Sequence, residues 1–176
     1  FQGLVFADIE IPLSDRAKMF SPKIEGRILD SINVQSDESV LEIGTGSGYF
    51  TAVLGKLAGN VVSIEIDPAL SASAKKNLQS LAITNVDLQV SDASTTNFSQ
   101  QKYDVIVLGC SLSAQSQKLN ELLNIGGRLF AIIGSKNKMQ ATLITRISDN
   151  EWQVKSIFET HLDYMQGQEP AAVFAF

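Results

Sequence analysis

Cysteine and histidine are almost absent from this 176-residue chain, which contains one of each, Cys110 and His161. A single cysteine cannot form an internal disulfide, which fits a reducing compartment. A lone histidine leaves no Ser-His-Asp triad and no histidine-based metal site, so we expect no bound metal. We interpret Cys110 as a small buried residue rather than a nucleophile, and His161 as a structural residue with satisfied hydrogen bonds.

Long apolar runs and basic stripes are also missing. No hydrophobic stretch approaches the length of a membrane span, and the chain does not open on a signal peptide. The net charge is -5, and Lys and Arg do not cluster as they do in proteins that bind duplex nucleic acid. We therefore expect a soluble cytoplasmic protein with neither a membrane nor nucleic acid as partner.

The composition is that of one folded domain. Hydrophobic residues make up 44% of the chain and charged residues 19%, which excludes a disordered protein. Residues 1–3, Phe-Gln-Gly, look like the remnant of a cleaved expression tag, so we place the domain at residues 4–176.

Strand-like and helix-like segments alternate along the chain. Strands are expected at 40–43, 61–67, 85–92, 103–109 and 128–134, and helices at 49–57, 68–81 and 113–123. This alternation predicts an α/β fold, with a Rossmann-like, doubly wound, mostly parallel sheet. Two β-rich runs, 141–147 and 152–159, flank the turn sequence SDNE and predict a C-terminal antiparallel hairpin that brings the sheet to seven strands. Trp152 and the tail residues Phe174 and Phe176 are interpreted as core or edge packing.

The segment VLEIGTGSGYF, residues 40–50, is typical of a buried strand that runs into a glycine-rich turn and then a helix. Gly44, Gly46 and Gly48 have GxGxG spacing, and glycines here let the backbone approach a bound molecule closely. Glu42 interrupts the apolar strand and needs a partner, either a cationic or hydroxyl-rich ligand or backbone amides that it caps. The candidate cofactor site also includes Thr45, Ser47 and Tyr49.

Further acidic residues stand at the ends of the next two strands. Glu65 follows the glycines by about 20 residues, where a carboxylate can accept both hydroxyls of a ribose. Asp92, followed by the small Ala93, can accept from the amino group of an adenine; alternatively it serves only as a turn or cap residue. The site is completed by Ile66 and Gly109.

The charge of these residues indicates which cofactor they bind. Carboxylates at three strand ends would repel a pyrophosphate, but they suit a cofactor that carries an ammonium and a sulfonium. S-adenosylmethionine has both groups. A nicotinamide dehydrogenase is disfavoured by the GxGxG spacing and by Asp92.

Before the sheet, Ser21-Pro22 predicts the start of another helix, with Ser21 as N-cap and Pro22 at the first position. Its apolar face is formed by Ile24, Ile28, Leu29 and Ile32. We expect this helix to pack at the sheet edge, near the glycine-rich turn.

The segment VLEIGTGSGY resembles the first motif of class I S-adenosylmethionine-dependent methyltransferases, in particular of the protein-L-isoaspartate O-methyltransferase family. NLQSLAITNVDLQVSDAS, YDVIVLG and LLNIGGRLFAIIG are similar to that family's later motifs in order and spacing, so the resemblance covers nearly the whole chain. It implies S-adenosylmethionine as cofactor, a protein or peptide carboxylate as methyl acceptor, and protein repair as the role.

Upstream, the chain also matches a family pattern, D-x-x-x-P followed by G-Q-T-I-S-x-P, at Asp8, Pro12 and Pro22. On the family's spacing, its Gly, Gln, Thr and active-site Ser fall on Arg16, Ala17, Lys18 and Phe20. The family's hydroxyl is therefore replaced by an aromatic ring. Ser21 and Lys18 remain as candidate catalytic residues, and Lys18 with Arg16 forms either a carboxylate clamp or a pair of solvated loop charges.

Two functions follow. The first is a methyltransferase of the isoaspartyl-repair type with an altered acceptor pocket. The second is a catalytically altered S-adenosylmethionine-binding protein that senses the cofactor and acts through a partner. Phe20 favours the second.

Overall fold

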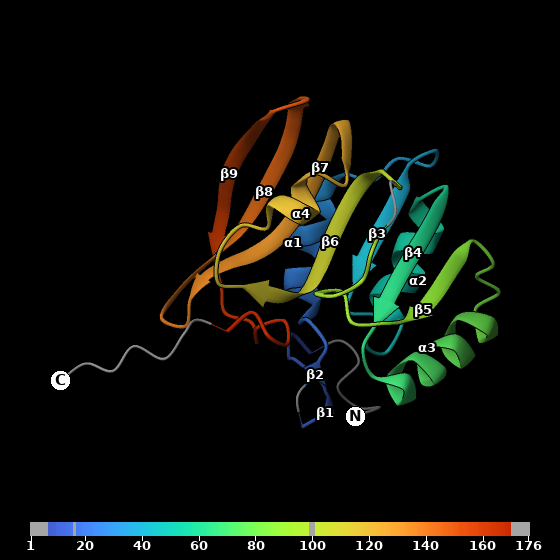
Figure 1. The fold of residues 1–176 in the computed structure, drawn as a ribbon. Helices are drawn as coiled ribbons and strands as arrows, with labels where there is room; N and C mark the ends of the chain where they lie inside the picture. Colours follow the sequence, from blue (N-terminus) through green and yellow to red (C-terminus); the bar gives the residue numbers. More distant parts are fainter. Residues whose placement is uncertain (1–6, 16, 99–100, 170–176) are drawn as a thin grey trace.

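The computed structural model describes residues 7–15, 17–98 and 101–169 (Figure 1). Residues 1–3, taken as a tag remnant, lie outside the described residues, as do Arg16, Phe174 and Phe176. The helices are α1 (Pro22–Ile32), α2 (Tyr49–Leu57), α3 (Pro68–Ser80) and α4 (Gln117–Asn120). The strands are β1 (Pro12–Ser14), β2 (Ala17–Lys18), β3 (Ser39–Ile43), β4 (Asn60–Glu65), β5 (Val86–Val90), β6 (Tyr103–Leu112), β7 (Leu123–Ser135), β8 (Lys138–Ser148) and β9 (Glu151–Glu159).

Seven of the described strands form one sheet in the order β5-β4-β3-β6-β7-β8-β9. The strands from β5 to β7 are parallel, whereas β8 and β9 pair antiparallel as the predicted C-terminal hairpin. The predicted α/β fold is therefore confirmed. Strand order reverses between β3 and β6, and in open α/β sheets a ligand binds beyond the strand ends at such a point.

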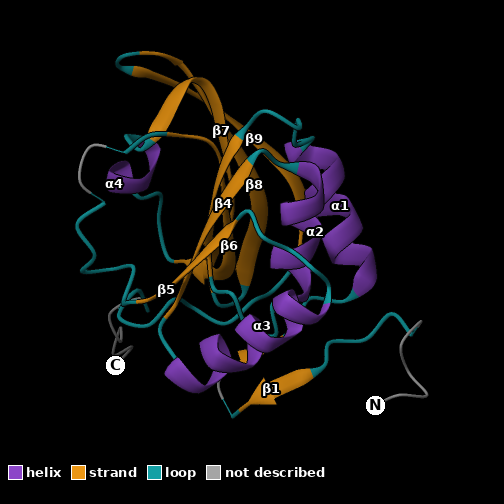
Figure 2. Ribbon diagram, turned by 90° about the vertical axis from the view of Figure 1, so that its right-hand side faces the viewer, coloured by secondary structure: helices purple, strands orange, loops and turns teal. Residues whose placement is uncertain are grey.

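The two faces of the sheet are covered unequally. Figure 2 shows α1, α2 and α3 on one side and the short α4 on the other. The predicted helix 113–123 is wrong in length, because β6 continues to Leu112 and β7 already begins at Leu123. Ser116 caps the short helix α4, and its side chain accepts a hydrogen bond from the Leu119 amide at 3.4 Å. None of the helices among the described residues is long and apolar enough to span a membrane.

Each face of the sheet has its own hydrophobic cluster. On the side of the long helices, Ile28 and Ile32 of α1 and Leu54 of α2 pack with residues of the central strands. On the other side, Leu119 of α4 belongs to a cluster against which Trp152 is packed. The Trp152 Nε1 group also donates to the Asn120 carbonyl at 3.2 Å, so this tryptophan fastens β9 to α4.

Helix α1 differs from its prediction in two ways. It packs against β7, which is an interior strand of the sheet, rather than against an edge strand. Ser21 occupies the N-cap position but its side chain makes no capping bond; instead Asp8 accepts the Lys23 amide at 3.0 Å. A hydrogen bond from the Ser21 side chain, followed by the Lys23 amide, holds the pKa of Asp8 below its ordinary value. A carboxylate distant in sequence thus replaces the predicted local cap, because residues before β1 return to the helix start.

The segment between β3 and α3 follows the prediction closely. Helix α2 has the predicted bounds, and Asp67 caps α3 by accepting the Ala69 amide at 2.7 Å and the Leu70 amide at 3.4 Å. β7 is longer than predicted: it includes Gly126-Gly127, where its pairing with β6 is irregular. A side chain at Gly127 would lie 2.9 Å from the Asn124 carbonyl oxygen, so this bend requires glycine.

Candidate functional site

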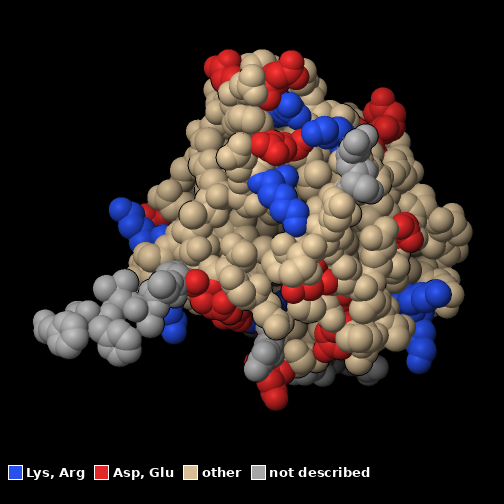
Figure 3. Space-filling model, in the orientation of Figure 1, with Lys and Arg blue, Asp and Glu red and all other residues tan. Residues whose placement is uncertain are grey.

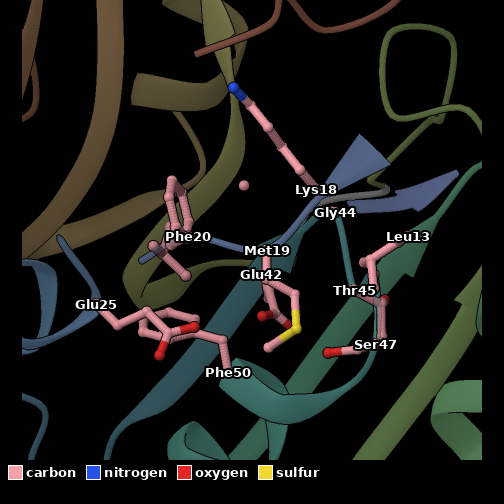
Figure 4. Close-up of a pocket in the computed structure, with 13 residues that line it drawn as sticks. Leu13, Lys18, Met19, Phe20, Glu25, Glu42, Gly44, Thr45, Ser47 and Phe50 are labelled. Atoms are coloured by element: carbon pink, nitrogen blue, oxygen red, sulfur yellow. The ribbon is translucent and has the colours of Figure 1, made fainter. Parts of the chain in front are cut away.

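Two connected cavities lie at the carboxyl ends of the parallel strands. The larger, called here the cleft, has a volume of about 1190 Å³ and runs from the end of β5, past β4 and β3, to the segment after β9. The smaller, called the inner pocket, is shown in Figure 4. The cleft and the inner pocket share Leu13, Lys18, Gly44, Gly46 and Gly109. The hairpin β1–β2 borders both, and its two short strands were not predicted.

The inner pocket is lined by the hairpin, the glycine-rich turn and the first turn of α1. Its lining residues are Leu13, Lys18, Met19, Phe20, Glu25, Glu42, Gly44, Thr45, Gly46, Ser47, Phe50, Val107 and Gly109.

The glycine-rich turn has the backbone conformation that its sequence predicts. Gly44, Gly46 and Gly48 have φ angles of 98°, 56° and 79°, which side chains rarely tolerate. Their surroundings differ, however. A side chain at Gly44 would lie 3.4 Å from the Gly109 backbone, whereas one at Gly48 would lie 2.9 Å from the Ala74 side chain of α3. Gly48 lines neither cavity, so its glycine serves helix packing.

Glu42 is the centre of a buried hydroxyl network. It is 2% exposed, and Oε2 accepts hydrogen bonds from Thr51 and Ser63, both at 2.6 Å. Because the Ser63 proton points to Glu42, Thr45 donates to Ser63 at 2.6 Å. Burial, reinforced by the negative charges of Glu65 and Glu25, raises the pKa of Glu42 to about 7 despite the two hydroxyls. The partners of this carboxylate are therefore hydroxyls, not the backbone amides considered above.

Glu65 is fixed at the end of β4 by two backbone amides. Its Oε2 accepts the Gly46 amide at 2.8 Å, and its Oε1 accepts the Asp67 amide at 3.0 Å. It is 6% exposed and lines the cleft. Each oxygen keeps a lone pair for a further donor, as recognition of a diol requires.

Asp92 holds a turn and also lines the cleft. Its Oδ1 accepts the Ser94 amide at 2.8 Å and the Ser94 hydroxyl at 2.7 Å, which holds the turn after β5 and lowers the pKa of Asp92. It also lines the cleft, together with Ala93 and the half-exposed Ile66. The turn role therefore does not remove it from the site.

Other residues lie differently from their predictions. Tyr49 is 53% exposed and lines neither cavity. His161, for which we expected a structural role with satisfied hydrogen bonds, is exposed in the cleft, where Ser111 of β6 holds the segment after β9 over the strand ends. The Ser111 amide donates to the Asp163 carbonyl at 2.9 Å, and its hydroxyl donates to the Leu162 carbonyl at 2.8 Å. Cys110 also lines the cleft, and burial raises the pKa of its thiol to about 12, which leaves it unreactive.

The candidate catalytic residues are not equivalent. Phe20 forms one wall of the inner pocket and packs edge-to-face on Phe50, with ring centroids 6.3 Å apart. Ser21 is 9% exposed, lines neither cavity and is engaged with Asp8. Lys18 borders both cavities, but its ammonium pairs with Glu10 at 2.7 Å. Lys18 alone of the two predicted candidates is thus present at the site.

One charged residue of the inner pocket was missed in the sequence analysis. Glu25 is 7% exposed, and burial raises its pKa to about 7. A signal existed in the sequence: Glu25 lies three residues before Ile28 and four before Leu29, which places a carboxylate on the apolar face of α1.

The cleft is predominantly acidic. Acidic and basic side chains are interspersed on the face seen in Figure 3, and acidic ones gather at its lower end. The charged residues that line the cleft are Asp15, Glu65, Asp67, Asp92, Asp163 and Glu169 against Lys18 and Lys136. Among the described residues, no group of three or more His, Cys, Asp or Glu side chains could hold a metal ion.

Comparison with known proteins gives a consistent result. The sequence profile of the protein-L-isoaspartate(D-aspartate) O-methyltransferase family matches residues 1–165. Protein-L-isoaspartate O-methyltransferase 2 of Marinobacter nauticus is 33% identical over 165 residues, which cover 93% of this chain and 75% of the relative. A protein-L-isoaspartate O-methyltransferase of Rhodopseudomonas palustris is 29% identical over 169 residues, covering 96% and 78%.

Solved structures share the fold. A protein-L-isoaspartate O-methyltransferase structure superimposes with a TM-score of 0.84 at 24% identity, covering 96% of this chain, which spans 56% of that protein's chain. A Plasmodium falciparum protein described as an enzyme of this type, in complex with S-adenosyl-L-homocysteine, gives a TM-score of 0.80 at 20% identity, covering 94% and 84%.

Proposed function

The chain belongs to the protein-L-isoaspartate(D-aspartate) O-methyltransferase family, and we propose that it transfers a methyl group from S-adenosylmethionine to a carboxylate of damaged protein. The observation that carries the proposal is that Glu65 and Asp92, at the ends of adjacent strands, line one acidic cleft beside the glycine-rich turn. As part of the same proposal, we place the protein in the cytoplasm, as the sequence leads us to expect.

The residues present fit this cofactor. A cleft with six carboxylates and two lysines along its wall favours a cationic ligand over a pyrophosphate. Glu65, held by two amides, is positioned to accept the ribose hydroxyls, and Asp92 with Ala93 and Ile66 is positioned for the adenine. Gly44, Gly46 and Gly109 leave room where the two cavities join. S-adenosylmethionine would supply an electrophilic methyl group on its sulfonium.

The acceptor needs little activation. A carboxylate is already a nucleophile, so the protein contributes mainly by positioning it in line with the methyl carbon. Lys18, on the border of both cavities, can attract the acceptor carboxylate, although Glu10 competes for its ammonium. Phe20 makes the nearby wall apolar and offers no hydroxyl.

Transfer of a labelled methyl group from S-adenosylmethionine to an isoaspartyl peptide tests the proposal. The same peptide with normal aspartate is the substrate control, and Gly46→Val is the enzyme blank. Gly46 has a φ of 56° and a side chain there would lie 3.0 Å from Leu13, so valine obstructs the junction of the cavities. A thermal melt establishes that the blank is folded. Activity no higher than that of a folded blank would refute the repair function.

A second function is favoured by Phe20: a protein that binds S-adenosylmethionine and signals its level through a partner. The ring of Phe20 replaces the hydroxyl that the family pattern has at this place, and Ser21 does not reach either cavity. Calorimetric binding of S-adenosylhomocysteine without turnover on carboxyl, amine or hydroxyl acceptors would favour this function over the enzyme.

A further inference from the structure

Glu25 has no visible reason to be buried in the protein alone. Its side chain belongs to α1, is 7% exposed and lines the inner pocket. Its own amide donates to the Ser21 carbonyl, but no other described residue donates a hydrogen bond to its carboxylate or forms an ion pair with it. Its carboxylate thus faces the pocket without a protein partner, and a charge in so enclosed a place is costly unless a ligand pairs with it.

A second carboxylate faces the same space. Glu42 projects from β3, and both Glu42 and Glu25 line the inner pocket; Figure 4 shows the side chain of Glu25 beside the Phe50 ring, with Glu42 nearby. Both hydroxyls that contact Glu42 donate to Oε2. Two carboxylates in an aromatic-walled pocket disfavour an anion and favour a group with positive charge and several donors.

The lysine at this pocket does not neutralise the pair. Lys18 is bonded to Glu10 at 2.7 Å, and Figure 4 shows its ammonium directed away from Glu25 and Glu42. Neither carboxylate is therefore paired with a cationic side chain among the described residues, which leaves their place in the pocket open to a cationic ligand.

The position of the inner pocket indicates which molecule. The cleft runs from Asp92 to Glu65 and on to Gly44, Gly46 and Gly109, where it joins the inner pocket. A ligand with its adenine at Asp92 and its ribose at Glu65 would place the far end of its chain at this junction. In S-adenosylmethionine that end carries the α-ammonium of the methionine part.

We propose that Glu25, together with Glu42, binds this α-ammonium and so fixes the amino-acid end of the cofactor. The inference rests on the proposed function, because it requires the same cofactor in the cleft. Glu25 then determines affinity for the amino-acid part of the ligand and leaves recognition of the nucleoside to Glu65 and Asp92.

Two ligands separate the two ends of the cofactor. S-adenosylhomocysteine carries the amino-acid part, and 5′-methylthioadenosine has the same nucleoside without it. Calorimetry should show that Glu25→Gln weakens binding of S-adenosylhomocysteine at least about tenfold, since a charge-assisted hydrogen bond is lost. Binding of 5′-methylthioadenosine should change less than about twofold, which also shows that the variant is folded. Asp30→Asn, an exposed change on the same helix, should leave both affinities unchanged.

The outcomes are distinguishable. The inference is wrong if Glu25→Gln binds S-adenosylhomocysteine as tightly as the unchanged protein, or if it loses affinity for both ligands equally. In either case Glu25 does not hold the ammonium, and the proposed function still stands. An ammonium-bearing acceptor as the occupant would give the first of these results. If the unchanged protein binds neither ligand, the proposed function fails and the inference fails with it.

Discussion

Gly44 and Gly109 face each other across the ends of β3 and β6: Gly109 has no room for a side chain, and Gly44 has a φ of 98° that side chains rarely adopt. A side chain at Gly109 would lie 2.9 Å from the Gly44 carbonyl oxygen and 3.3 Å from that of Ile43. Since β3 and β6 pair up to Ile43 and Leu108, directly before the two glycines, this backbone has little freedom to move aside. The switch point of the sheet is therefore built on a contact between two glycines.

Gly109→Ala should destabilise the protein by about 1–3 kcal/mol through overpacking and abolish S-adenosylhomocysteine binding. Gly26→Ala is the matched control, because a side chain at Gly26 in α1 meets nothing within 4 Å. It should stabilise the protein by about 0.4–1 kcal/mol. Urea denaturation and calorimetry measure both effects, and a Gly109→Ala protein as stable as the parent would contradict the glycine contact.

Glu25 and Glu42 should make the unliganded protein less stable as the pH rises. Burial raises the pKa of each to about 7 from an ordinary value of 4.5, so the folded state binds more protons than the unfolded chain between these values. The free energy of unfolding should therefore fall between about pH 5 and about pH 8. Carboxyls with lowered pKa, such as Asp104 and Glu38, are already ionised throughout this range.

Glu42→Gln removes one of these titrations while keeping an oxygen for Thr51 and Ser63. It should recover roughly 2–3 kcal/mol of stability at about pH 8 relative to about pH 5. Urea denaturation at both values measures the change. Glu151→Gln, at an exposed position, should keep the full decrease. The same decrease in Glu42→Gln as in the parent would refute the role of burial.

Binding of the proposed cofactor should have the opposite pH dependence. An ammonium between Glu25 and Glu42 favours their ionised forms, so affinity for S-adenosylhomocysteine should rise roughly tenfold from about pH 5.5 to about pH 7.5. The α-ammonium itself stays mostly protonated in this range. The other charged group at the inner pocket, Lys18, is paired with Glu10. Affinity for 5′-methylthioadenosine should stay flat, and a parallel rise for both ligands would contradict the assignment.

Phe20→Ser places a hydroxyl on the wall of the inner pocket, at the position where the sequence pattern predicts the family's serine. It should increase methyl transfer to an isoaspartyl peptide several-fold, on the order of 1 kcal/mol in the barrier, while lost packing on Phe50 costs about 2–4 kcal/mol of stability. Phe20→Ala gives a similar cavity without the hydroxyl and separates the two effects. No gain of Phe20→Ser over Phe20→Ala would show that the hydroxyl is not what the pocket lacks.

Ser21→Ala should change activity by less than about twofold, because its hydroxyl is engaged with Asp8 and does not line either cavity. Steady-state assays against the same peptide measure this. A large loss of activity would restore Ser21 as a catalytic residue.

The central part of the fold could be predicted because its signals are local. Apolar strands, the glycine turn and the Asp67-Pro68 cap each specify their own backbone within a few residues. The hairpin β1–β2 could not be found this way, since strands of three and two residues show no alternation. The cap of α1 was not predicted for another reason: Asp8 accepts a hydrogen bond from the Lys23 amide, which is fifteen residues further along the chain.

The candidate site was predicted more completely at the ends of β4 and β5 than at the inner pocket. Glu65 and Asp92 follow strands, and the ends of parallel strands meet by topology alone. Glu25 reaches the site from a helix that crosses the sheet, and its place depends on how α1 packs on β7. Arg128 of β7 reinforces that contact by donating a hydrogen bond to the Asn33 carbonyl at 2.8 Å. No short sequence motif predicts such a contact between distant elements.

Trp152, which fastens β9 to α4, is the one tryptophan of the chain and lies apart from both cavities. Its fluorescence should therefore change when the protein unfolds and should not change when a ligand binds in the cleft. Emission and calorimetry then report two independent quantities on one unlabelled sample, so a variant that has lost its ligand can be told from one that has lost its fold.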